Sequence, residues 1–265
     1  MRAYVGPEGK QVHVRRAGDH GPWILLFHES PQNSNVYERA LPHLGRRARV
    51  VAFDTPGYGM SDPPEHPLEI PDYARLLLDA ADELGVDRFA VVGQHTGASI
   101  ALEVARLAGE RATHAVVSGL ALFDDATRQR YLDDWAPDLP VDPEGRHLMD
   151  LWARYERLWE QPPELLNLSV ANIASVFERY NWAYNAAFRH DPAPVLAEST
   201  YPILLLTASR DLLVQSDEMA LQLRPDARRM TLTDTTGQLP WRLPEEWSRI
   251  VADFVTGRLD EEARP

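Results

Sequence analysis

The stretch AVVGQHTGASIALEVA, residues 90–105, places a histidine where chemistry is expected. An apolar run that predicts a buried strand ends at Gly93, and small residues open a predicted helix after Gly97, so His95 stands in a strand-to-helix turn. A side chain in such a turn points into the space beyond the end of the strand, where ligands of open α/β sheets bind. Since an imidazole has an unperturbed pKa of about 6.5, His95 predicts a group that exchanges protons near neutral pH.

Four further segments accompany this turn in a fixed order along the chain. They are FHESP (27–31), FDTPGYGMSDPP (53–64), LLLTASRDLLV (204–214) and TTGQLPW (235–241). In these segments and in the His95 turn, the chain resembles the α/β-hydrolase superfamily over nearly all of its length. Members of that family mount a serine nucleophile on a Gly-x-Ser-x-Gly turn of this kind. The resemblance implies the same fold, with a histidine in the place of the serine.

The resemblance also implies roles for three side chains. It places His95 at the nucleophile position, Asp211 at the position of the acid, and Gln238 at the position of the general base. An amide cannot titrate near neutral pH, so Gln238 can form hydrogen bonds but cannot shuttle a proton. The imidazole has therefore moved onto the turn. We expect His95 to contact Asp211, either directly or through Gln238, with the carboxylate fixing the tautomer.

An oxyanion hole is implied as well, because its donors are backbone N–H groups that survive changes of side chain. The family positions correspond to the N–H groups of Thr96 and Ser30. Glu29 replaces the glycine that the family carries in the early loop. Its carboxylate would repel an anionic substrate or serve as a second acid/base group, and both readings stay open. The pocket candidates are His28, Glu29, Trp182, Tyr184 and Leu239.

Each functional reading has a structural counterpart. His95 could be a turn residue on a scaffold that no longer catalyses, Asp211 a capping aspartate, and Gln238 the remnant of an unused base. His28 is typical of a residue that supports its loop. Aromatic residues at helical spacing between residues 152 and 184 suit core packing, with one or two of them at the pocket. They are Trp152, Tyr155, Trp159, Tyr180, Trp182 and Tyr184.

The elements that must position these side chains follow from apolar periodicity. Apolar runs predict parallel strands at 23–28, 49–54, 89–93, 114–120, 202–208 and 227–234. A crossover helix begins near Pro71 and ends at Gly85, and a final helix covers 244–257. Between 124 and 197, helical periodicity interrupted by prolines predicts an insertion of three or four helices. The predicted fold is a mostly parallel sheet flanked by helices, with a core (1–123 and 198–265) and a helical cap (124–197).

Composition excludes several classes of function. A chain of 265 residues with 44% hydrophobic residues predicts one globular domain with an insertion. The start of the chain has no signal-peptide pattern, so a cytoplasmic location is expected. With no cysteine and a net charge of −13, disulfides are excluded, and nucleic acid and membrane surfaces are not expected partners. No ligand spacing predicts a metal and no glycine loop predicts a cofactor. The expected partner of a monomer or homodimer is a small-molecule substrate.

Three hypotheses follow from this pattern. In the first, His95 works as a general acid/base without a covalent intermediate, in a lyase, isomerase, decarboxylase or cyclase that acts on a partly hydrophobic carbonyl compound. In the second, the protein hydrolyses an ester, a lactone or a C–C bond, with His95 as the nucleophile or as the base that activates water. In the third, the pocket binds a ligand and catalyses nothing.

Overall fold

Eight strands form a single sheet in the computed structural model, which describes residues 1–6 and 9–260. The strand order is β1-β2-β4-β3-β5-β6-β7-β8, with β1 and β2 antiparallel to their neighbours and all the others parallel. The strands are β1 (Arg2–Val5), β2 (Val12–Ala17), β3 (Trp23–Phe27), β4 (Arg49–Phe53), β5 (Phe89–Gln94), β6 (Ala112–Ser118), β7 (Ile203–Ala208) and β8 (Arg228–Leu232). The six parallel strands lie where the apolar runs predicted them.

The two antiparallel strands were not predicted from the sequence. Strand β1 is a half-exposed edge strand, and β2 ends in polar residues, so neither contains a continuous apolar run. A parallel strand covered on both faces is apolar throughout, whereas an edge strand carries a weaker signal. The missing signal therefore reflects the position of β1 and β2 at the border of the sheet.

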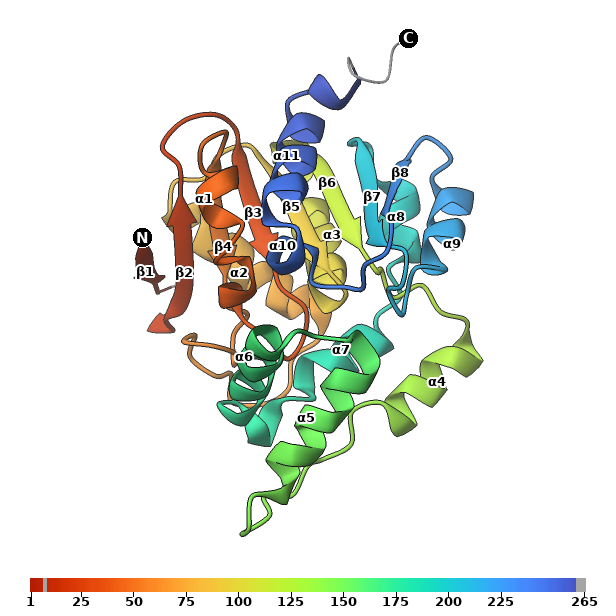
Figure 1. Ribbon diagram of the computed structural model, residues 1–265. Helices are drawn as coiled ribbons and strands as arrows, with labels where there is room; N and C mark the ends of the chain where they lie inside the picture. The colour runs from red at the N-terminus through yellow and green to blue at the C-terminus, as the bar shows by residue number, and fades with distance from the viewer. Residues whose placement is uncertain (7–8, 261–265) are drawn as a thin grey trace.

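Helices cover both faces of the sheet and give two separate cores. Along β3, Leu25 and Phe27 point to the face covered by α2 (Ile70–Glu83) and α3 (Thr96–Ala108). Ile24 and Leu26 point to the opposite face, where α1 (Leu41–Leu44) and α11 (Pro244–Val255) pack. This alternation follows the two-residue period of a strand. Figure 1 shows α1 and α11 on the near side of the sheet and α3 behind it.

The segment between β6 and β7 contains five α-helices. They are α4 (Asp125–Asp134), α5 (Arg146–Trp159), α6 (Pro163–Ala174), α7 (Trp182–Arg189) and α8 (Ala193–Glu198). Helices α4 and α7 contact each other, as do α5 and α6, and α4 to α7 gather beyond one end of the sheet (Figure 1). Helix α8 packs instead against α3 and α9 (Ser216–Leu223) of the sheet layer. Among the residues described, no helix has both the length and the apolarity to cross a bilayer.

Candidate active site

The turn that carries His95 joins β5 to α3 through a backbone conformation rare for a side chain other than glycine. His95 has φ 47° and ψ −115°, and its N–H donates to the carbonyl of Ser118 at 2.8 Å. Helix α3 begins immediately afterwards against β3, where a Cβ on Gly97 would lie 2.1 Å from the carbonyl oxygen of Phe27. Strained backbone of this kind persists where the surroundings fix it, and such sites cluster in ligand pockets.

The imidazole of His95 and the carboxylate of Asp211 form a direct ion pair. The Nε2 atom lies 3.0 Å from each carboxylate oxygen, although the two residues come from the ends of different strands, β5 and β7. The N–H of Leu213 donates to Oδ1 of Asp211 at 2.8 Å and holds the carboxylate in place. The expected contact therefore exists in its direct form, without Gln238 between the two groups.

This pairing sets the protonation of both groups. Burial opposes the charged imidazolium, but the negative charges of Asp211 and Glu29 outweigh it, so the pKa of His95 is raised. Burial alone would raise the pKa of Asp211, but His95 and the Leu213 N–H lower it. When Nε2 donates its hydrogen to Asp211, Nδ1 is the ring nitrogen left for a ligand.

Two neighbours fit closely around the imidazole. A Cβ on Gly119, which has φ +60°, would lie 2.3 Å from Cδ2 of His95, so only glycine leaves room for the ring. The indole of Trp159, at the end of α5, lies on the ring with centroids 5.4 Å apart and planes at 32°. The carbonyl of Trp159 accepts hydrogen bonds from the Thr236 hydroxyl at 2.8 Å and from the Arg242 guanidinium at 2.7 Å.

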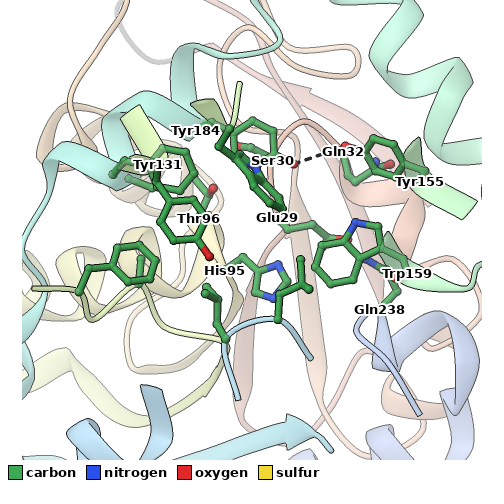
Figure 2. A pocket seen from close by; sticks show the side chains of 17 residues that line it. Glu29, Ser30, Gln32, His95, Thr96, Tyr131, Tyr155, Trp159, Tyr184 and Gln238 are labelled. Carbon is green, nitrogen blue, oxygen red and sulfur yellow. Dashed lines mark hydrogen bonds between the residues drawn. The ribbon is translucent and has the colours of Figure 1, made fainter. Parts of the chain in front are cut away.

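Glu29 and Gln238 bring polar atoms into the pocket without partners. Glu29 is 4% exposed, and among the described residues neither of its carboxylate oxygens has a hydrogen-bond partner. Burial raises the pKa of Glu29, which His95 and the neighbouring Gln238 partly offset. The side-chain oxygen of Gln238 is also buried and unpartnered there, and its backbone is left-handed, with φ 58°. Figure 2 shows Glu29 and Gln238 among the side chains that line the pocket together with His95.

Ser30 and Thr96, whose N–H groups are the expected oxyanion donors, both line this pocket. Thr96 is the first residue of α3, so its N–H has no acceptor one turn earlier in the helix. Ser30 belongs to the loop after β3, which an amide cluster ties to α6. In this cluster Asn172 donates to Gln32 at 2.7 Å and to Asn35 at 3.0 Å, and it accepts from Asn33 and Asn35 at 3.0 Å.

Seven aromatic rings line this pocket, and together they form what we call its aromatic wall. They are Phe123, Tyr131, Trp135, Tyr155, Trp159, Tyr184 and Phe188. The rings support one another: Tyr131 stacks on Phe123 at 4.8 Å and on Phe188 at 5.1 Å, and the hydroxyls of Tyr155 and Tyr184 lie 3.4 Å apart. Tyr131 and Trp135 were missed by the sequence reasoning, although their spacing of four residues places them on one face of a helix.

Three of the pocket candidates lie elsewhere. His28 is buried beneath the loop, where Nε2 accepts from the N–H of Thr55 at 3.0 Å and Nδ1 bonds to the carbonyl of Glu29 at 2.9 Å. Leu239 packs in the core beneath α11, and Trp182 stands outside the pocket at the start of α7. Leu239 is the residue after Gln238, and the tight turn into α10 (Leu239–Arg242) directs it to the core. Glu29 and Tyr184 do line the pocket.

A metal centre does not arise from these side chains. Within residues 1–6 and 9–260, no group of three or more His, Asp or Glu side chains is arranged to hold an ion. His95, Asp211 and the backbone donors instead form a site suited to proton transfer and to stabilising negative charge on oxygen.

Comparisons with known proteins agree on the fold. A family model described as alpha/beta hydrolase fold matches residues 22–235. The crystal structure of the enol-lactonase from Burkholderia xenovorans superposes with a TM-score of 0.78 at 19% identity, covering 96% of this chain and 100% of that one. The predicted fold class and the resemblance are thereby confirmed.

Curated relatives divide into a partial match and a nearly complete one. Haloalkane dehalogenase 2 of Mycobacterium tuberculosis is 36% identical over 104 residues, which are 39% of this chain and 36% of that protein. The match thus spans about a third of the length of that relative. The 2-(acetamidomethylene)succinate hydrolase of Mesorhizobium japonicum is 26% identical over 267 residues, covering 92% of this chain and 91% of the relative.

Proposed function

This chain belongs to the alpha/beta hydrolase fold family, and from that premise we propose that it is an enzyme that transforms a small, partly hydrophobic carbonyl compound by proton transfer at His95. The reaction is of the lyase, isomerase, decarboxylase or cyclase type, with no bond between enzyme and substrate. The observation that carries the proposal is the direct pair between Nε2 of His95 and both oxygens of Asp211, beside an amide at position 238.

This pair favours an acid/base role for the imidazole. Asp211 holds Nε2 and stabilises the charge that forms when Nδ1 takes a proton from the substrate. The N–H groups of Thr96 and Ser30 stabilise the negative charge that develops on the carbonyl oxygen. Return of the proton from Nδ1 to another atom of the substrate completes the reaction. Covalent catalysis by the family route needs a titrating base at position 238, where Gln238 stands.

The proposal is tested by following hydrogen exchange at carbon. Ketones such as phenylacetone are incubated with the protein in D₂O, and NMR records the replacement of hydrogen next to the carbonyl. We expect His95→Ala to slow this exchange by about 10²- to 10⁴-fold, the usual contribution of a positioned acid or base. His66→Ala is the matched control, because His66 is exposed and far from the pocket lining.

Intact-protein mass spectrometry during turnover separates the two kinds of chemistry. Proton transfer predicts an unmodified protein mass throughout. A substrate fragment that accumulates on wild type and is absent from His95→Ala would contradict the proposal. Exchange that proceeds at the wild-type rate in His95→Ala would contradict it as well.

Hydrolysis is the second candidate, favoured by the name of the nearly full-length relative from Mesorhizobium japonicum. An imidazole at this turn can take an acyl group, and an acyl-imidazole is labile enough to hydrolyse with little help. Release of nitrophenol from p-nitrophenyl acetate, lost in His95→Ala together with a transient acetyl adduct, would favour this candidate. The succinate of that relative's name does not fit, because the pocket lining contains no Lys or Arg to pair with carboxylates.

A further inference from the structure

The polar atoms left unpaired in the pocket are acceptors. Glu29 and Gln238 line one cavity, and the Gln238 side chain lies close enough to lower the pKa of Glu29. By hydrogen-bond geometry, both carboxylate oxygens of Glu29 and the side-chain oxygen of Gln238 are buried without a partner among the described residues. A buried carboxylate without partners is costly, and the cost is relieved by a proton or by a ligand that donates to it. The arrangement therefore calls for hydrogen-bond donors on the ligand.

Charge narrows the choice of donor. Glu29 is the acidic residue of the pocket lining, and Asp211 lies behind His95. Among the described residues, the lining contains no Lys or Arg. The chain carries a net charge of −13, which attracts cations and repels anions at a distance. Among the described residues of the lining, His95 is the one side chain whose positive charge can balance these carboxylates, and Asp211 already engages it.

The aromatic wall supplies the second requirement for a cation. Seven rings line the same pocket as Glu29, and the faces of Trp and Tyr rings attract ammonium groups. Trp159 and Tyr155 belong to α5, while Tyr184 belongs to α7, so this wall is built by the helices that lie beyond the sheet. A carboxylate in a pocket lined by aromatic rings suits an organic ammonium ion, because the carboxylate accepts its hydrogen bonds and the ring faces attract its charge.

We propose that the substrate is a carbonyl compound that carries a protonated amine, with the ammonium hydrogen-bonded to Glu29 and Gln238 within the aromatic wall. The carbonyl then lies at the N–H groups of Thr96 and Ser30. This inference rests on the proposed function for the location of the carbonyl and adds the chemical class of the substrate. Glu29 acts here as a specificity residue that binds the substrate.

The substrate charge also affects the catalytic imidazole. Glu29 contributes to the raised pKa of His95, and an ammonium ion paired with Glu29 cancels that contribution. His95 then loses its proton more readily and is available as a base. Binding of the correct substrate therefore prepares the group that acts on it.

The experiment compares three probes of one shape: benzylamine as a cation, benzyl alcohol as a neutral donor, and benzoate as an anion. Isothermal titration calorimetry at pH 7 measures their affinities for wild type and for Glu29→Gln. We expect wild type to bind benzylamine about tenfold tighter than benzyl alcohol, with benzoate weakest. In Glu29→Gln the preference for the amine should disappear, while the affinity for benzyl alcohol changes less than about twofold. Glu156→Gln, at an exposed position on α5, is the matched control.

Several results would overturn the proposal: benzyl alcohol or benzoate binding as tightly as benzylamine, no benzylamine binding at millimolar concentration, or an unchanged amine preference in Glu29→Gln. Should Glu29→Gln fail to fold by circular dichroism, Gln238→Leu replaces it and should weaken benzylamine selectively. His95→Ala separates this proposal from the proposed function. It should keep the amine preference while losing proton exchange, so either claim can fail while the other stands.

Discussion

The indole of Trp159 lies against the imidazole of His95, with ring centroids 5.4 Å apart, so the end of helix α5 covers part of the side chain carried by the turn after β5. Trp159 is itself fixed at its carbonyl by Thr236 and Arg242, which flank Gln238 along the chain. The segment that carries the Gln238 side chain therefore also fixes the position of Trp159 in the pocket wall. This contact covers part of the imidazole, whose side chain is 15% exposed, and electrostatic effects are stronger where less water reaches the charged groups.

Truncation of Trp159 should affect both stability and reaction rate. Trp159 is 5% exposed, so Trp159→Ala should lower the free energy of unfolding by about 3 kcal/mol, as for other large aromatic side chains removed from a core. Hydration of His95 should also slow proton exchange by about tenfold. Trp159→Phe keeps a ring over the imidazole and should retain most of both properties. Urea denaturation measures the free energy of unfolding, and the exchange assay measures the rate of proton exchange. Equal exchange rates in Trp159→Ala and Trp159→Phe would contradict a role for the ring that covers His95.

The pH dependence of the reaction should follow the raised pKa of His95. The base form is the neutral imidazole, so the rate should rise with pH through a midpoint above 6.5. In Asp211→Asn the carboxylate that raises this pKa is gone, whereas burial still lowers it, so the midpoint should move to lower pH. An NMR titration of the His95 ring protons, assigned by their loss in His95→Gln, measures both midpoints.

The control for this titration is Asp87→Asn, because Asp87 is exposed and outside the pocket lining. Its midpoint should equal that of wild type. A midpoint in Asp211→Asn at or above the wild-type value would show that Asp211 does not hold the proton on His95.

Gly119 should tolerate no side chain. A Cβ there would lie 2.3 Å from the His95 ring, so Gly119→Ala should displace the imidazole from Asp211 and abolish proton exchange. Gly109→Ala is a close match, since Gly109 has φ +58° but no atom within 4 Å of its Cβ position. Both variants carry the backbone cost of alanine at positive φ, roughly 1 kcal/mol. Only Gly119→Ala should lose the exchange, and equal losses would point to backbone strain in place of the ring contact.

The amide cluster should control the loop that carries Glu29 and Ser30. Asn172→Leu removes four hydrogen bonds to the side-chain amides of Gln32, Asn33 and Asn35, of which Gln32 and Asn33 are buried, so it should lower the free energy of unfolding by about 2 to 3 kcal/mol. Asn167→Leu, at an exposed position of the same helix, should change it by less than about 0.5 kcal/mol. Urea denaturation measures both. A similar value for the two variants would mean that the cluster contributes no net stability.

Much of the fold was predictable because its signal is local. The parallel strands are covered on both faces, so each one reads as an apolar run, and the His95 turn follows directly from the strand and helix beside it. The edge strand β1, its antiparallel neighbour β2 and the number of helices between β6 and β7 were not predictable in the same way. Their boundaries depend on packing against elements far away in the chain.

The site was predictable only where position in the family governs it. Asp211 lies 116 residues from His95, and no spacing rule connects them; the resemblance alone suggested the pair. The aromatic wall could not be separated from core aromatics, because Tyr131 and Trp135 have the periodicity of any packed helix face. Trp182 and Leu239 are pocket candidates in the sequence, but Trp182 lies outside the pocket lining at the start of α7 and Leu239 packs in the core.

The pairing of Asp211 with Nε2 of His95 also limits how single substitutions could give the chain a serine nucleophile. A return to serine chemistry requires two coordinated changes, because His95→Ser alone leaves a hydroxyl with no base, since Gln238 cannot take its proton. Gln238→His alone introduces a second imidazole beside Glu29, while the first still occupies the turn. The path that begins with His95→Ser therefore passes through an intermediate that lacks both the imidazole at the turn and a base for the new hydroxyl. The residues at positions 95 and 238 must therefore change together before a serine at the turn can have a histidine as its base.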